Sequence, residues 1–131
     1  MSGHFTLVAN NVLKILVGQQ GGTGSSSSEK AGGGGGGSFV HNASTNSPLI
    51  VSAAGNGENW SSFTTNGPDG LTGNNGTTSG GSLGGRGSGG GGFSTNGANF
   101  SSSTGGLSFT NGGVGGLKFD SGYADGGFGG G

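Results

Sequence analysis

The residues best suited to chemistry in this sequence are one serine in a glycine-rich pattern and two histidines. The stretch GGSLG around Ser82 matches the pattern that presents the nucleophilic serine of many hydrolytic enzymes. That serine needs a strand before it, a helix after it and a histidine later in the chain as its base. No histidine follows His41, and a helix is not expected in so glycine-rich a stretch. The sequence therefore predicts no catalytic residue, and a protein that is not an enzyme.

Metal and cofactor sites are also not expected. His4 and His41 lie in segments that read as strands, without acidic residues beside them in the sequence. Asp120 and Asp125 lie near each other but lack the ligand spacing of a calcium loop. The polyglycine run contains the glycine pattern of nucleotide-binding loops only trivially, without the phosphate-binding lysine. We therefore expect no bound metal and no cofactor.

Composition excludes several further classes. Glycine accounts for 39 of 131 residues, and four basic residues stand against five acidic ones. A net charge of −1 gives no basic surface for nucleic acid or for anionic lipid. No apolar run approaches the roughly 18 residues of a membrane helix. The absence of cysteine excludes a disulfide framework. We expect no nucleic-acid partner and no membrane insertion.

The aliphatic residues concentrate in the first part of the chain and predict β-strands there. Strands are expected at 5–8, 12–17, 38–41 and 48–53, where β-branched and aromatic residues are frequent. Asn10 and Asn11 suit a tight hairpin turn between the first two segments. Pro48 is compatible only with the start of a strand or with an edge strand. Residues 1–57 are thus predicted to be strand-rich, and residues 58–131 to form a glycine-rich part packed against them in one domain.

The glycine runs admit one ordered structure. Each glycine in an α-helix costs about 1 kcal/mol relative to alanine, and glycine offers no side chain to pack in a sheet. A polyglycine-II helix is extended, has three residues per turn and makes no internal hydrogen bonds, so its backbone groups can bond neighbouring helices on every side. We predict a mainly β protein without α-helix, in which a small β-sandwich joins a bundle of such helices; flexible linkers are the alternative. The packing residues would be Gly32, Gly33, Gly34, Gly35, Gly36, Gly37, Gly89, Gly90, Gly91 and Gly92.

Repeated Phe and Asn-Gly units punctuate the second part of the chain. Asn66-Gly67, Asn96-Gly97 and Asn111-Gly112 each follow a phenylalanine and one or two hydroxyl residues, and Asn-Gly is a strong turn signal. We expect these units to reverse the chain, with aromatic side chains lining the bundle. The candidate interface or binding residues are Trp60, Phe63, Phe93, Phe100, Phe109 and Tyr123. Four N-glycosylation sequons begin at Asn42, Asn59, Asn75 and Asn99.

Several blocks of sequence resemble a known family. The run VLKILVGQQG from Val12, the glycines 32–37, the run PLIVSAAG from Pro48 and the glycine-rich residues 126–131 are similar in order to the glycine-rich ectodomain of the anaplastic lymphoma kinase and leukocyte tyrosine kinase receptors. The resemblance implies a tumour-necrosis-factor-like β-sandwich carrying a polyglycine-II bundle, in an extracellular setting. The tip adhesins of T-even phage tail fibres are similar at the glycine level only. The family's cysteines and its later strands have no counterpart in this sequence, so receptor signalling does not carry over.

Two functions of different class follow. The first is an extracellular or surface-located structural protein that associates with itself into a fibre, through its glycine helices and the open edge of an incomplete sandwich. An incomplete sandwich would equally fit a piece of a longer chain. The second is a module that binds a cell-surface receptor or glycan through its aromatic and Asn/Thr loops. Ice binding by rows of Thr and Asn is a third, weaker reading, because the repeat lengths are irregular.

Overall fold

The strands in the described part of the chain form one small antiparallel sheet. The computed structural model describes residues 2–24, 32–56 and 88–131. It contains β1 (Leu13–Leu16), β2 (Ser38–Asn42) and β3 (Ser47–Ser52), in the sheet order β1-β2-β3. Within the described ranges there is no α-helix, and the helical turn η1 (Phe109–Asn111) is of the 3-10 type. The expected mainly β, helix-free fold is confirmed for this part of the chain.

The two faces of the sheet differ in what covers them. Phe39 on β2 points to the inner face and is 1% exposed. On the opposite face the register aligns Ile15, Val40 and Ile50 in one row, which we call the outer row. Ile15 is 67% exposed, whereas the other two side chains of the outer row are half-buried. The sandwich expected from the sequence requires a second sheet, and the described residues supply one sheet only.

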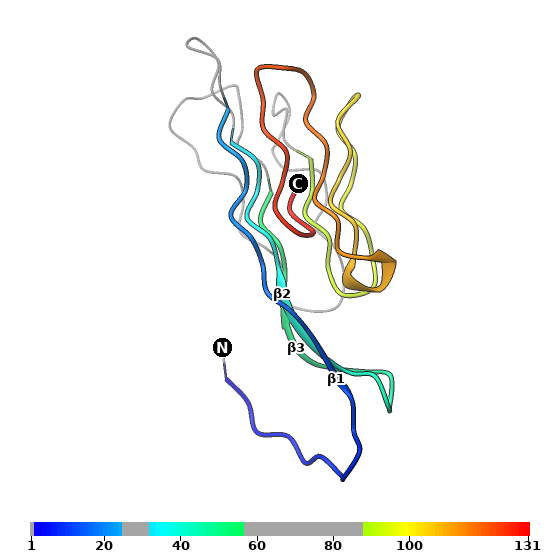
Figure 1. Ribbon diagram of the computed structural model, residues 1–131. Coiled ribbons are helices and arrows are strands. Elements are labelled where there is room, and N and C mark those ends of the chain that lie inside the picture. Colours follow the sequence, from blue (N-terminus) through cyan, green and yellow to red (C-terminus); the bar gives the residue numbers. More distant parts are fainter. Residues whose placement is uncertain (1, 25–31, 57–87) are drawn as a thin grey trace.

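Three of the four expected strands form, each within one residue of its expected bounds. Pro48 is the second residue of the edge strand β3, which agrees with its missing N–H group. The strand expected at 5–8 is wrong, because this segment is not assigned as a strand and pairs with none of the described strands. A turn does form there, with the Asn11 amide donating to the Val8 carbonyl at 3.1 Å. Only Asn10 has a positive φ in this turn, so the tight two-residue hairpin turn does not form and the arms diverge (Figure 1).

An aromatic cluster joins the sheet to the rest of the molecule. Phe39 and His41 of β2 meet Phe93 and Phe109, with ring centroids between 5.3 and 6.5 Å apart. Phe93 and Phe109 stack at 15°. His41 is 8% exposed and donates from Nε2 to Asn46 Oδ1 at 3.2 Å, whereas its buried Nδ1 has no hydrogen-bond partner among the described residues. The cluster is the main side-chain core of the described residues.

Extended, glycine-rich segments run side by side beyond the sheet and fill the upper part of Figure 1. We call them the glycine array. Backbone hydrogen bonds connect them, and the last segment, which carries the C-terminus, lies among the others. Segments from both compositional parts of the chain contribute. The array comprises residues 18–24, 32–37, 53–56, 88–92, 96–99, 104–108, 113–117 and 124–131.

Candidate functional site

The backbone hydrogen bonding between β1 and β2 continues into the glycine array, but the spacing of the bonds along the chain changes. In the sheet, Leu16 lies opposite Phe39. Three residues further along each segment, the Gly36 amide donates to the Gln19 carbonyl at 2.7 Å, and after three more the Gly33 amide donates to the Gly22 carbonyl at 3.0 Å. Bonds to one neighbour recur every second residue in a β-strand. In the array they recur every third residue while the register is kept.

The segment from Thr104 to Phe109 shows the same period toward three separate neighbours. The amides of Thr104 and Leu107 donate to the carbonyls of Leu117 and Val114, at 3.2 and 2.7 Å. The amides of residues 106 and 109 donate to the carbonyls of residues 89 and 92, at 3.0 Å each. The remaining two amides turn toward a third segment. Six consecutive donors are thus shared, in strict rotation, among three surrounding segments.

Asparagine side chains supply acceptors where the third neighbour does not offer a carbonyl. The Gly105 amide donates to Asn99 Oδ1 at 2.9 Å, and the Ser108 amide donates to Asn96 Oδ1 at 2.8 Å. Asn56 Oδ1 accepts from the Gly90 amide at 2.9 Å in a buried position. Because a buried amide without a partner costs about 1–3 kcal/mol, these side chains are part of the backbone network. This role was not predicted from the sequence, although the spacing of three residues between Asn96 and Asn99 was a signal for it.

Close backbone approach explains why the array needs glycine. A methyl group added at Gly97 would meet the Gly89 carbonyl, and one at Gly106 would meet the Gly129 carbonyl. Neither position has a positive φ, so the requirement comes from space and not from backbone conformation. Gly35 is an exception, because an added methyl group there would meet no atom of the described residues within 4 Å.

The expected packing glycines lie in the array and use their backbone groups. Gly33, Gly34, Gly36 and Gly37 donate to residues of the 18–24 and 124–131 segments. The run at 89–92 bonds the 96–99, 104–108 and 124–131 segments and the Asn56 side chain. Of the expected reversals, Asn111-Gly112 does reverse the chain, with φ of +101° at the glycine. Asn96-Gly97 does not: the bend precedes it, and the Gly97 amide bonds Gly106 within an extended segment.

The aromatic residues predicted to form an interface differ in how deeply they are buried. Phe93 and Tyr123 are each 7% exposed, and Phe109 is half-buried in the aromatic cluster. Phe100 is half-buried beside the turn that precedes Ser103. Trp60 and Phe63 lie outside the described residues, as does the serine at 82.

The two described sequons differ in accessibility. Asn42 is 4% exposed, its Oδ1 accepts from two backbone amides, and its Nδ2 donates to Asn11 at 3.1 Å. Asn99 is exposed and precedes a turn in which Ser101 has a φ of +51°. Asn59 and Asn75 lie outside the described residues.

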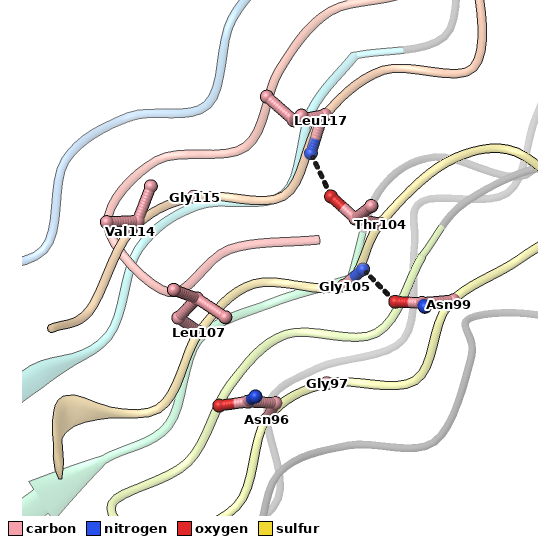
Figure 2. Close-up of a pocket in the computed structure, with 9 residues that line it drawn as sticks. All are labelled: Asn96, Gly97, Asn99, Thr104, Gly105, Leu107, Val114, Gly115 and Leu117. Carbon is pink, nitrogen blue, oxygen red and sulfur yellow. Dashed lines mark hydrogen bonds between the residues drawn. The ribbon is translucent and has the colours of Figure 1, made fainter. Parts of the chain in front are cut away.

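A hollow of about 410 Å³ opens on the outer side of the array (Figure 2). Three neighbouring segments line it, and each contributes two side chains that lie three residues apart in the sequence. Val114 and Leu117 are 55% and 60% exposed, and the described residues that line the hollow include no charged side chain. The paired residues are Asn96 and Asn99, Thr104 and Leu107, and Val114 and Leu117.

The residues described offer no other chemical centre. They contain no group of three or more metal-ligating side chains, and none of their helices has the length and hydropathy required to cross a bilayer. The two described carboxylates act locally: Asp120 Oδ1 accepts from the Gly122 amide, and Asp125 Oδ1 accepts from the Lys118 amide, at 2.8 Å each. These bonds fix loop conformation.

Comparisons with protein-family models, with curated proteins and with solved structures found no match. The resemblance to the glycine-rich receptor ectodomain and to the phage adhesins therefore stays a prediction from the sequence.

Proposed function

We propose that this protein is a non-enzymatic structural protein whose glycine array is a bundle of polyglycine-II helices, and that copies associate into a fibre or surface assembly. The expected setting is outside the cell, or on the surface of a cell or virion. The bundle would provide a rigid body made mainly of backbone, and the sheet would provide the surface for association.

The observation that carries the proposal is the rotation of donors among three neighbours in residues 104–109. A helix with three residues per turn directs every third N–H to the same side, whereas a β-strand directs its groups to two sides in one plane. The pattern is therefore what a polyglycine-II helix surrounded by others requires. The close approach at Gly97 and Gly106 supports the same packing.

Self-association is supported by the distribution of exposed apolar residues. Leu13, Ile15 and Val17 are 38%, 67% and 70% exposed, and they alternate along β1 and the residue after it, so they share one face beside the edge of the sheet. An apolar patch of this kind marks an interaction surface. Residues 13–17 carry a single charge, at Lys14, so two copies can approach without strong repulsion.

Sedimentation velocity over a wide concentration range, with electron microscopy of the fastest species, tests the proposal. We expect mass to grow with concentration and elongated particles to appear. A protein that stays monomeric at millimolar concentration would refute the proposed assembly. Infrared spectra of the same samples should show amide I absorption of extended glycine helices in monomer and assembly alike, since the bundle is intramolecular.

The hollow of Figure 2 favours a second candidate, a module that binds an uncharged ligand such as a glycan. Asn and Thr side chains beside exposed leucine and valine offer hydrogen-bonding and apolar contacts on one surface. A glycan array with the wild-type protein and with Leu117→Asp tests it. Specific binding that Leu117→Asp abolishes would support it, and an array without binding would count against it.

A further inference from the structure

We propose that the segment Phe5–Val8 of one copy adds as a strand to the free edge of β1 in a second copy. This inference rests on the proposed self-association and identifies the two surfaces that carry it. It starts from two features of a single molecule. One is an edge strand whose outer backbone groups face away from the sheet. The other is a segment with a strand-like sequence pattern that pairs with none of the strands described.

The free edge of β1 can be located from its hydrogen bonds. The Ala43 amide donates to the Val12 carbonyl at 2.8 Å, so the backbone groups of Val12 face β2. In an antiparallel pair, every second residue faces the partner strand. The backbone groups of Leu13, Ile15 and Val17 therefore face the opposite side, where no further strand follows in the part of the chain that the structure describes. An open edge of this kind is a template for pairing with another chain.

The segment that we place on this edge is exposed and has the pattern of a strand. Phe5, Leu7 and Val8 are 44%, 44% and 68% exposed. Phe5 and Leu7 alternate with Thr6, as expected for a strand with one apolar face. The segment precedes the turn at Val8–Asn11. It diverges from the sheet and does not lie along β1 of its own molecule (Figure 1). We call residues 2–8 the N-terminal arm.

The chemistry of the two surfaces agrees in an antiparallel register. Pairing Phe5 with Ile15 and Leu7 with Leu13 places two further apolar side chains beside the outer row of the sheet. Such cross-strand apolar pairs stabilise a sheet by about 0.2–1 kcal/mol each. Lys14 lies on the other face of β1, opposite the threonine of the arm, so no like charges meet across the junction.

The junction has a direction, because each copy offers one arm and one edge at different places. Such a heterologous contact continues from copy to copy and produces a chain of subunits unless it closes into a ring. The rival arrangement is closure of the arm onto the β1 edge of its own molecule. That arrangement uses the same pairs but yields a monomer.

Two variants, each lacking one half of the junction, test the inference. Deletion of residues 2–8 removes the arm, all of which is exposed. Ile15→Pro removes an N–H that faces the free edge and leaves the bonds to β2 in place; Ile15→Lys is the second edge variant if proline disturbs the sheet. Sedimentation velocity should show each variant alone associating about a hundredfold more weakly than the wild type.

Mixing the two variants gives the decisive result. The deletion variant still has the edge and the proline variant still has the arm, so an equal mixture should form a 1:1 dimer and nothing larger. Leu117→Lys is the matched control, because Leu117 is 60% exposed but lies on the array, and it should assemble like the wild type.

The outcomes separate this inference from the proposed function. If the wild type assembles and either variant assembles equally well, the arm-to-edge junction is wrong while self-association stands. A wild type that stays monomeric overturns both. A mixture that remains monomeric, with both variants folded by near-ultraviolet circular dichroism, overturns the junction alone.

Discussion

Two neighbouring glycines in one run provide a direct test of the packing in the array. The amide of Gly34 donates to the backbone oxygen of Gly131 at 2.7 Å, and the Gly34 carbonyl accepts from the Gly127 amide at 3.0 Å. A methyl group added at Gly34 would meet the Gly55 carbonyl and would lie 2.7 Å from the carbonyl carbon of Asn56. At Gly35, one residue further, the backbone is exposed and an added methyl group meets no described atom within 4 Å.

The expected effects of Gly34→Ala and Gly35→Ala therefore have opposite signs. Relief of the clash at Gly34 requires backbone movement, and overpacking costs about 1–3 kcal/mol. The same movement weakens the two hydrogen bonds of Gly34, each worth about 1 kcal/mol. We expect Gly34→Ala to lower the free energy of unfolding by about 2–5 kcal/mol. Gly35→Ala should leave it unchanged or raise it by about 0.4–1 kcal/mol, because alanine restricts the unfolded chain.

Urea unfolding at low protein concentration, followed by near-ultraviolet circular dichroism, measures both variants against the wild type. A domain has a total stability of about 5–15 kcal/mol, so the Gly34 variant should show a clearly lower midpoint. Equal midpoints for the two variants would refute the close backbone packing on which the polyglycine-II proposal depends. A loss of stability in Gly35→Ala alone would show that the run is oriented differently from the arrangement described above.

Three further predictions concern named side chains. Asn96→Ala should destabilise the protein by about 1–3 kcal/mol, because it leaves the buried Ser108 amide without its acceptor. Asn96→Asp keeps an oxygen acceptor at this place, and thermal unfolding of the two variants checks the difference. Phe93→Ala, in the aromatic cluster, should cost about 3–5 kcal/mol in urea unfolding, while Phe128→Ala, 41% exposed, should cost far less. After passage through a eukaryotic secretory pathway, peptide mass spectrometry should find glycan at Asn99 and none at Asn42, whose amide is buried and bonded.

The sheet was predictable because its signal is carried by side chains. The β-branched residues of 12–17 and 48–53 locate β1 and β3 within one residue. The conformation of residues 5–8 could not be predicted in the same way. Their sequence pattern suits a strand, but whether they pair with β1 depends on the geometry of the turn between them. Asn10 alone takes a positive φ, and the Val8 amide bonds Asn11 Oδ1 at 3.2 Å, which directs the chain away from β1.

The candidate site was predictable in kind and not in detail. Gly32–Gly37 and Gly89–Gly92 were expected to pack through their backbones, and their hydrogen bonds cross between segments. Which segments meet could not be read from the sequence, because a glycine run presents the same surface at every residue. The asparagine acceptors resembled turn signals, and Asn96-Gly97 was misread for that reason. The Asn96 side chain accepts a hydrogen bond from the Ser108 amide, which lies 12 residues away in the sequence, so the local sequence does not reveal its role.

The uniformity of glycine raises the question of what fixes the register of the array. A run such as 32–37 could slide by one residue without changing the surface that it presents. The register is set from outside, because both flanking ladders enter the array without a break. Beyond the pair Leu16–Phe39 the bonds continue at Gln19–Gly36, and beyond the pair Phe39–Val51 the Gly55 amide reaches the Gly35 carbonyl in the same alignment. A slip would therefore have to break the sheet and remove Phe39 from the aromatic cluster, so side chains in the sheet specify the packing of segments that have none.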